Sequence, residues 1–161
     1  MKGSIGYFSR FRMTAPIVAV NLEGEGEGMS KKAALIITHG KFGIELLKST
    51  EMIMGEQEDA KALGLSLGES VDELREEADR IIVENQEAER DNVIFVDILG
   101  GSPSNIALYL LKKYKNIKLV TGVNMLMLIE FFQSRDFEEL DDLVDKIINS
   151  SVDGTKKYEA K

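Results

Sequence analysis

A chain of 161 residues with 43% hydrophobic and 30% charged residues is the size of one globular domain, and it contains no run of about 20 apolar residues that could cross a bilayer. It has no cysteine and one histidine, which excludes disulfides, zinc–cysteine sites and a catalytic zinc held by several imidazoles. The formal net charge of −8 repels phosphates at long range, so we expect no nucleic acid as a partner.

Residues 1–28 differ in character from the rest of the chain. They end in an alternating glutamate and glycine tract, residues 23–28, which is typical of a linker. The apolar run before it, residues 17–20, is too short for the apolar core of a signal peptide, so we expect a cytoplasmic protein. We interpret residues 1–28 as an extension or cloning-derived leader, residues 29–150 as the domain, and residues 151–161 as a tail.

From residue 31 onward, short apolar runs alternate with longer helical patterns, which predicts a parallel sheet flanked by helices. The first strand, residues 33–38, is almost wholly apolar, as a strand buried on both faces should be. A helix follows from Phe42 to Met54, with Gly55 as its stop. Ser70 and Glu73 form a capping-box pattern at the start of the next helix. The other expected strands span residues 61–66, 93–96 and 117–121, and the other expected helices span residues 71–88, 106–114, 125–133 and 140–148.

Polar residues follow the first and third expected strands. His39 comes at the end of the first strand, and Asp97 comes at the end of the third. If the strand order is 2-1-3-4, these strands are neighbours, and the ligand crevice of such a sheet lies beyond their carboxyl ends. A carboxylate that accepts the N–H of one imidazole nitrogen leaves the other nitrogen free as a nucleophile. We therefore expect His39 and Asp97 to form one catalytic site.

The segment after Asp97 reads Gly100-Gly101-Ser102-Pro103. Ser102 as N-cap and Pro103 as first helical residue predict a helix start, where free N–H groups and the helix dipole suit a phosphoryl group. The same segment also fits an ordinary strand-to-helix turn, and a lone histidine also fits an ordinary surface side chain. Their placement at one edge of the predicted sheet favours a functional site.

Three ordered motifs extend over about residues 31–148. They are Thr38-His39-Gly40 with residues 51–57, then Phe95-Val96-Asp97 with Gly100-Gly101-Ser102-Pro103 and Asn105, then Gly122-Val123-Asn124 with Met127, Leu128 and Glu130. Together they resemble the mannose-family enzyme IIA of the bacterial sugar phosphotransferase system. One departure is Leu126, where the familiar mannose transporter protein has proline, and this difference leaves the transported sugar open.

The resemblance implies a function and partners. His39 would be phosphorylated by the carrier protein HPr and would pass the phosphoryl group to enzyme IIB, with Asp97 orienting the imidazole. The groups expected around the phosphoryl group are those of Thr38, Gly40, Gly101 and Ser102. The resemblance implies neither a metal nor a cofactor, and the membrane would be reached only through the IIC/IID transporter complex.

The resemblance also implies a doubly wound, mainly parallel α/β sheet of order 2-1-3-4 with helices on both faces. The family is a homodimer that exchanges an antiparallel edge strand between its subunits. That strand would lie after Gln133, with a turn at residues 153–155. The apolar stretch 125–132 adds to the expectation of a homodimer, because it offers more hydrophobic surface than one helix face normally buries.

Other functions remain open at this point. A hydrolase could use Ser102, His39 and Asp97 as a triad, but the pattern Gly-x-Ser-x-Gly is absent and proline follows the serine. Phosphorylation of His39 could instead serve a regulatory module that reports sugar supply. It could also serve the phosphodonor subunit of the dihydroxyacetone kinase system. For a carrier we expect an apolar rim that two partners contact, with Phe42 and residues 125–127 as candidates.

Overall fold

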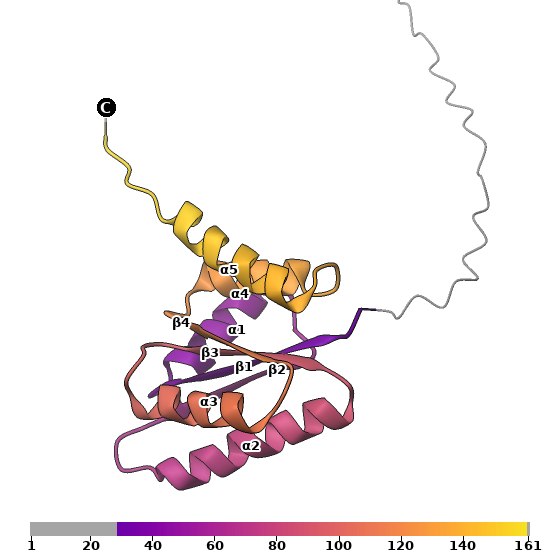
Figure 1. Cartoon of the computed structure of the whole chain (residues 1–161). Helices are drawn as coiled ribbons and strands as arrows, with labels where there is room; N and C mark the ends of the chain where they lie inside the picture. The colour runs from indigo at the N-terminus through magenta and orange to yellow at the C-terminus, as the bar shows by residue number, and fades with distance from the viewer. Residues whose placement is uncertain (1–28, 161) are drawn as a thin grey trace, which may run out of the picture.

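The computed structural model describes residues 29–160, which form a four-stranded sheet with helices on both faces (Figure 1). The strands are β1 (Lys32–His39), β2 (Ala60–Leu65), β3 (Asp91–Val96) and β4 (Ile117–Thr121). The helices are α1 (Phe42–Met54), α2 (Val71–Glu87), α3 (Ser102–Lys113), α4 (Met125–Ser134) and α5 (Leu140–Gly154). The strands pair in parallel in the order β2-β1-β3-β4, which confirms the expected topology. The expectations for residues 1–28 lie outside the described residues.

The two central strands, β1 and β3, are buried on both faces because helices cover both sides of the sheet (Figure 1). On β1, Ala34 and Ile36 face a core formed with α1, α4 and α5. Leu35 and Ile37 face a second core formed with α2 and α3. This period-two alternation between two apolar layers is the physical reason why β1 reads as a continuous apolar run.

Local capping signals set several helix ends where the sequence places them. Gly55 follows α1 with a φ of 85°, a conformation that suits glycine. The Ser70 hydroxyl accepts the backbone N–H of Glu73 at 3.3 Å, which forms one half of the expected capping box. Asn124 caps α4, since its side-chain oxygen accepts the Met127 N–H at 3.1 Å.

The start of α3 differs from the expectation. Gly101, and not Ser102, is the N-cap, so the helix begins at Ser102. This start is one residue before the one that the Ser102-Pro103 pattern predicts and four residues before residue 106. The hydroxyl that organises this turn belongs to Ser104, which accepts the Gly100 N–H at 2.9 Å and donates to the Gly101 carbonyl at 2.8 Å. Ser104 is fully buried, so its hydroxyl needs these backbone partners, whereas Ser102 is half-buried at the surface.

Helix α5 is longer than expected. It continues to Gly154, so residues 153–155 close a helix and do not form the expected turn, and residues 135–160 contain no strand. Leu143, Ile147 and Ser151 are spaced four residues apart and are all buried, so the inward face of α5 extends beyond residue 148. The sequence pattern misses this extension because the last buried position holds a polar residue.

Helix α4 lies between α1 and α5 (Figure 1). Most of its apolar side chains are buried within the chain: Met127, Leu128, Phe131 and Phe132. The apolar stretch 125–132 is thus largely accounted for by packing within the chain itself. Within residues 29–160, no helix has the length and apolar character needed to span a membrane.

Candidate active site

His39 and Asp97 meet at the carboxyl edge of the sheet, where the neighbouring strands β1 and β3 end. Asp97 Oδ2 lies 2.8 Å from His39 Nδ1 and accepts the backbone N–H of His39 at 2.9 Å. The other carboxylate oxygen, Oδ1, accepts the backbone N–H of Ile98 at 2.8 Å. Backbone donors therefore hold the carboxylate in place, and the carboxylate in turn holds the imidazole.

The protonation of this pair follows from the contacts of Asp97. Partial burial raises the pKa of Asp97. Hydrogen bonds from the His39 backbone and ring and from the Ile98 backbone lower it, and together they outweigh the burial, so the pKa lies below the usual value for aspartate. The carboxylate is ionised at neutral pH and can only accept hydrogen bonds. Nδ1 of His39 must then be the donor, which leaves Nε2 as the free ring nitrogen.

The imidazole lies directly against the backbone of Gly101. A Cβ atom at Gly101 would lie 2.5 Å from Cε1 and 2.8 Å from Nε2 of His39, so a side chain at this position fits only if the imidazole moves. Gly101 is the N-cap of the 12-residue helix α3. Nε2 is thus beside the first turn of a helix, where backbone N–H groups have no partner within the helix and favour an anion.

Thr38 and Gly40, the residues that flank His39, hold the end of β1 in place. Thr38 is fully buried, and its hydroxyl accepts the N–H of Gly43 at 2.8 Å, so it supports the first turn of α1 from beneath the site. Gly40 has a φ of 54° and donates its N–H to the Leu65 carbonyl at 2.7 Å. This bond ties the turn after His39 to the end of β2.

Two further glycines shape the site although the sequence analysis did not assign them to it. Gly64 on β2 lies so close to the Gly40 carbonyl that a Cβ atom would overlap with it. The Gly122 N–H donates to the Asp97 carbonyl at 3.1 Å from the loop after β4. The motif Gly122-Val123-Asn124 pointed to this loop, but pattern alone does not show which backbone group the loop contacts.

A family model described as "PTS system fructose IIA component" matches residues 33–148 of this sequence, where PTS denotes the phosphotransferase system. The chain belongs to this family. The fold and the placement of His39 and Asp97 at the strand ends agree with the resemblance inferred from the motifs.

Relatives of this IIA family member extend the comparison. This chain is 32% identical over 130 residues to the mannose-specific EIIAB component of Escherichia coli (strain K12). The alignment covers 80% of this chain and 40% of that protein. It is 30% identical over 115 residues to the fructose-specific EIIA component of Bacillus subtilis (strain 168), covering 71% of this chain and 78% of that protein. The crystal structure of phosphotransferase system component EIIA from Streptococcus agalactiae superimposes with a TM-score of 0.71 at 34% identity, covering 78% of this chain and 96% of that one. The chain thus spans less than half the length of the E. coli relative.

Exposed apolar side chains lie in the loops and at the start of α1, at the same edge of the IIA domain as His39. Phe42, Leu67, Ile98 and Leu99 are each at least 49% exposed. We call these four residues the apolar rim. Phe42 was expected there, whereas Met127 is 7% exposed and is packed into the core, so the expectation that Met127 contacts a partner is wrong.

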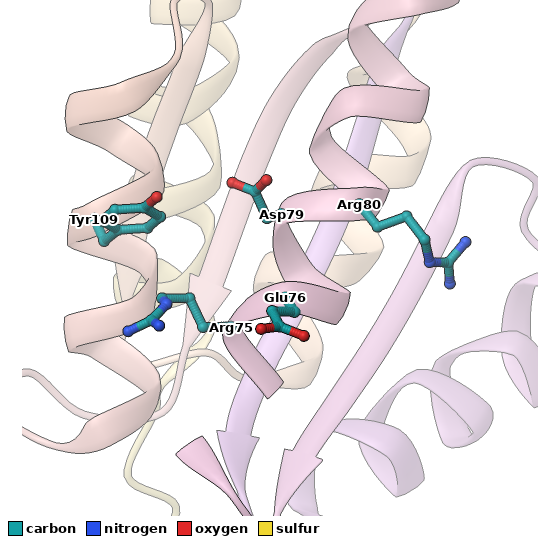
Figure 2. A pocket seen from close by; sticks show the side chains of 5 residues that line it. All are labelled: Arg75, Glu76, Asp79, Arg80 and Tyr109. Carbon is teal, nitrogen blue, oxygen red and sulfur yellow. The ribbon is translucent and has the colours of Figure 1, made fainter. Parts of the chain in front are cut away.

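Charged side chains also line a cavity away from this edge. A cavity of about 300 Å³ lies between α2 and α3, with Tyr109 on α3 and the other lining residues on α2 (Figure 2). Three of its four charged side chains pair with neighbouring groups: Arg75 with Asp72 at 2.9 Å, Asp79 with Lys113 at 2.7 Å, and Arg80 with Glu77 and Glu84. Among residues 29–160, no three His, Cys, Asp or Glu side chains are grouped as metal ligands.

The hydrolase alternative finds no support in the geometry of the described residues. A triad requires a hydrogen bond between the serine hydroxyl and the histidine. The hydrogen bonds of the His39 side chain within residues 29–160 run to Asp97, and no bond joins His39 to Ser102.

Proposed function

We propose that this protein is a phosphoryl carrier of sugar uptake, in which His39 accepts a phosphoryl group from phospho-HPr and transfers it to enzyme IIB. The observation that carries the proposal is the 2.8 Å bond between Asp97 Oδ2 and His39 Nδ1, which leaves Nε2 free beside the first turn of α3. Membership of the IIA family supports the two partners.

The proposed transfer needs only groups that this site holds and the phosphorylated donor. The lone pair of Nε2 forms a bond to phosphorus while the bond between phosphorus and the donor breaks, and the donor keeps the electron pair. Nδ1 keeps its proton, and the Asp97 carboxylate stabilises the positive charge that the ring gains. Transfer to enzyme IIB reverses this order, with a nucleophile of that partner attacking the phosphorus and Nε2 as the leaving group.

The surroundings of Nε2 suit the phosphoryl oxygens. The N–H groups of Gly101 and Ser102 belong to the start of α3, where the helix dipole is positive, and they would bind these oxygens. Gly40 and the buried Thr38 would support the site by holding the end of β1. The site is at an open edge, where the apolar rim offers two partners in turn a surface to contact.

Phosphorylation tests the proposal directly. Incubation with phosphoenolpyruvate, enzyme I and HPr should add one phosphoryl group that is stable in base and lost in acid, as expected for a phosphorus–nitrogen bond. Omission of HPr should prevent labelling, and a nucleoside triphosphate should not replace phosphoenolpyruvate, since the chain has no Walker pattern. His39→Ala should carry no label, and a label that persists on this variant would disprove the assignment.

The proposal includes a cytoplasmic homodimer that reaches the membrane only through the IIC/IID transporter complex. Exposed apolar side chains support self-association: Met52 and Ile53 of α1 are 87% and 64% exposed, and Val152 of α5 is 68% exposed. Light scattering should report twice the monomer mass at micromolar concentration, and a monomer under these conditions would count against the dimer.

The names of the relatives refer to two different sugars. The relatives at 32% and 30% identity are named as mannose-specific and fructose-specific, respectively. A transfer assay with several enzyme IIB partners would identify the acceptor of this chain, because the partner that accepts the phosphoryl group fastest marks the transporter to which it belongs.

A further inference from the structure

The side chain of Asn124 joins the loop between β4 and α4 to helix α5. Its Oδ1 atom accepts the Met127 N–H at 3.1 Å and caps α4. Because Oδ1 is occupied there, the amide orientation is set, and Nδ2 donates to the Ser151 hydroxyl at 2.8 Å. Nδ2 also lies 3.4 Å from the Gly122 carbonyl within the same loop. The Asn124 amide thus anchors the loop twice: Oδ1 binds the start of α4, and Nδ2 binds Ser151 on α5.

The loop held by Asn124 contacts the backbone on which Asp97 is carried. The Gly122 N–H donates to the Asp97 carbonyl, and the Val123 N–H donates to the Val96 carbonyl, both at 3.1 Å. The carboxylate of Asp97 then accepts the N–H from His39 Nδ1. A short path of hydrogen bonds and neighbouring residues therefore connects α5 to the imidazole.

Ser151 is an unusual residue at its position on α5. It is 9% exposed and lies on the helix face that buries Leu143 and Ile147, where a polar side chain needs a hydrogen-bond partner. Asn124 supplies that partner. The same end of α5 touches α4 where Leu126 rests on Gly154, with no room for a Cβ atom unless Leu126 moves. The family match ends at residue 148, so both contacts involve residues beyond it.

We propose that Ser151 is a positioning residue for the His39–Asp97 pair and acts through Asn124. The inference rests on the proposed function and adds the last turn of α5 to the support of the site. Loss of the Ser151 hydroxyl removes one anchor of Asn124, which loosens the loop that holds the Asp97 backbone. The carboxylate then holds Nδ1 in the productive orientation for a smaller share of the time.

Matched substitutions in the full-length protein test this role. Ser151→Ala should lower the rate of transfer from phospho-HPr by about fivefold, the effect of weakening one hydrogen bond in the support of the pair. Ser151→Thr keeps the hydroxyl and should retain most of the rate. Ser150→Ala is the control, because it removes a neighbouring hydroxyl that bonds Glu130 Oε2 on α4 at 3.0 Å but does not contact the loop. It should transfer at the rate of the unaltered protein.

NMR provides a readout that does not depend on transfer. Ser151→Ala should shift the amide signals of Gly122 and His39 and the Nδ1–H signal of His39, whereas Ser150→Ala should leave them in place. Unchanged signals and rate in Ser151→Ala would overturn the inference, as would equal slowing in both variants, which would indicate only a weakened α4–α5 contact. If the unaltered protein accepts no phosphoryl group, the proposed function fails, while the NMR comparison still tests the positioning.

Discussion

One oxygen of Asp97 accepts two hydrogen bonds from His39: Oδ2 receives the backbone N–H at 2.9 Å and the ring Nδ1–H at 2.8 Å. The same atom therefore fixes the main chain at the end of β1 and the imidazole that projects from it. Because Oδ1 is held by the Ile98 N–H, the carboxylate cannot rotate freely to follow the ring. The ring must adapt to the carboxylate, so its tautomer and orientation are set before any partner binds.

Replacing the Asp97 carboxylate by an amide should disturb the orientation of the His39 imidazole without disturbing the fold. Asp97→Asn should slow phosphoryl transfer by at least about 100-fold, because an amide can select the wrong imidazole tautomer and cannot stabilise the cationic ring. Rapid-quench measurement of transfer from phospho-HPr gives the rate, and nitrogen NMR of His39 gives the tautomer. Normal circular dichroism with unchanged transfer would show that Asp97 merely ends a strand.

The contact between the imidazole and Gly101 predicts a steric effect. The φ of Gly101 is −94°, so alanine meets no backbone strain there, and the added Cβ acts only on the ring. Gly101→Ala should displace Nε2 and lower the transfer rate by about 100-fold, as misplacements of about 1 Å do. Thermal unfolding should change little. A variant that transfers at the original rate would mean that the ring does not need this contact.

The depressed pKa of Asp97 predicts how its contribution to stability depends on pH. A carboxyl group with a lower pKa in the folded state stabilises the fold above its unfolded pKa of about 3.9, and this contribution is lost as pH falls through the folded pKa. The difference in melting temperature between the unaltered protein and Asp97→Asn should therefore be constant near neutral pH and shrink below about pH 4. Calorimetry at several pH values measures it, and a difference that grows at acidic pH would contradict the sign.

The apolar rim predicts a partner contact that does not depend on salt. Phe42 is 49% exposed and lies three residues after His39, so Phe42→Ala should reduce transfer from phospho-HPr at every ionic strength. Tyr158→Ala is the control, since Tyr158 is 89% exposed in the C-terminal tail. Equal rates for Phe42→Ala and the unaltered protein would remove Phe42 from the partner surface.

The net charge of −8 predicts a separate effect on association. If it attracts a partner with a positive face, the transfer rate at low protein concentration should fall as salt rises, because the Debye length shortens to about 8 Å at physiological ionic strength. Stopped-flow measurements across a salt series test this. A rate independent of ionic strength would disprove electrostatic steering and leave the role of His39 unaffected.

The sequence by itself determined the features that depend on neighbouring residues. The apolar run of β1, the stop at Gly55 and the cap at Ser70 are local signals, and the structure contains each of them. The placement of His39 and Asp97 at the ends of neighbouring strands also follows from pattern, once the alternation of strands and helices indicates a parallel sheet.

Only the tertiary structure decided which groups touch across the fold. Ser102 and Ser104 are both serines at the start of α3, and the sequence does not distinguish their roles. Because Ser104 is buried, its hydroxyl is the one that organises the start of the helix. Likewise, nothing near Ser151 in the chain indicates a partner, because Asn124 lies 27 residues away and reaches it only once α5 packs on α4. Such contacts arise from the packing of whole elements, and local patterns of hydrophobicity and capping carry no information about them.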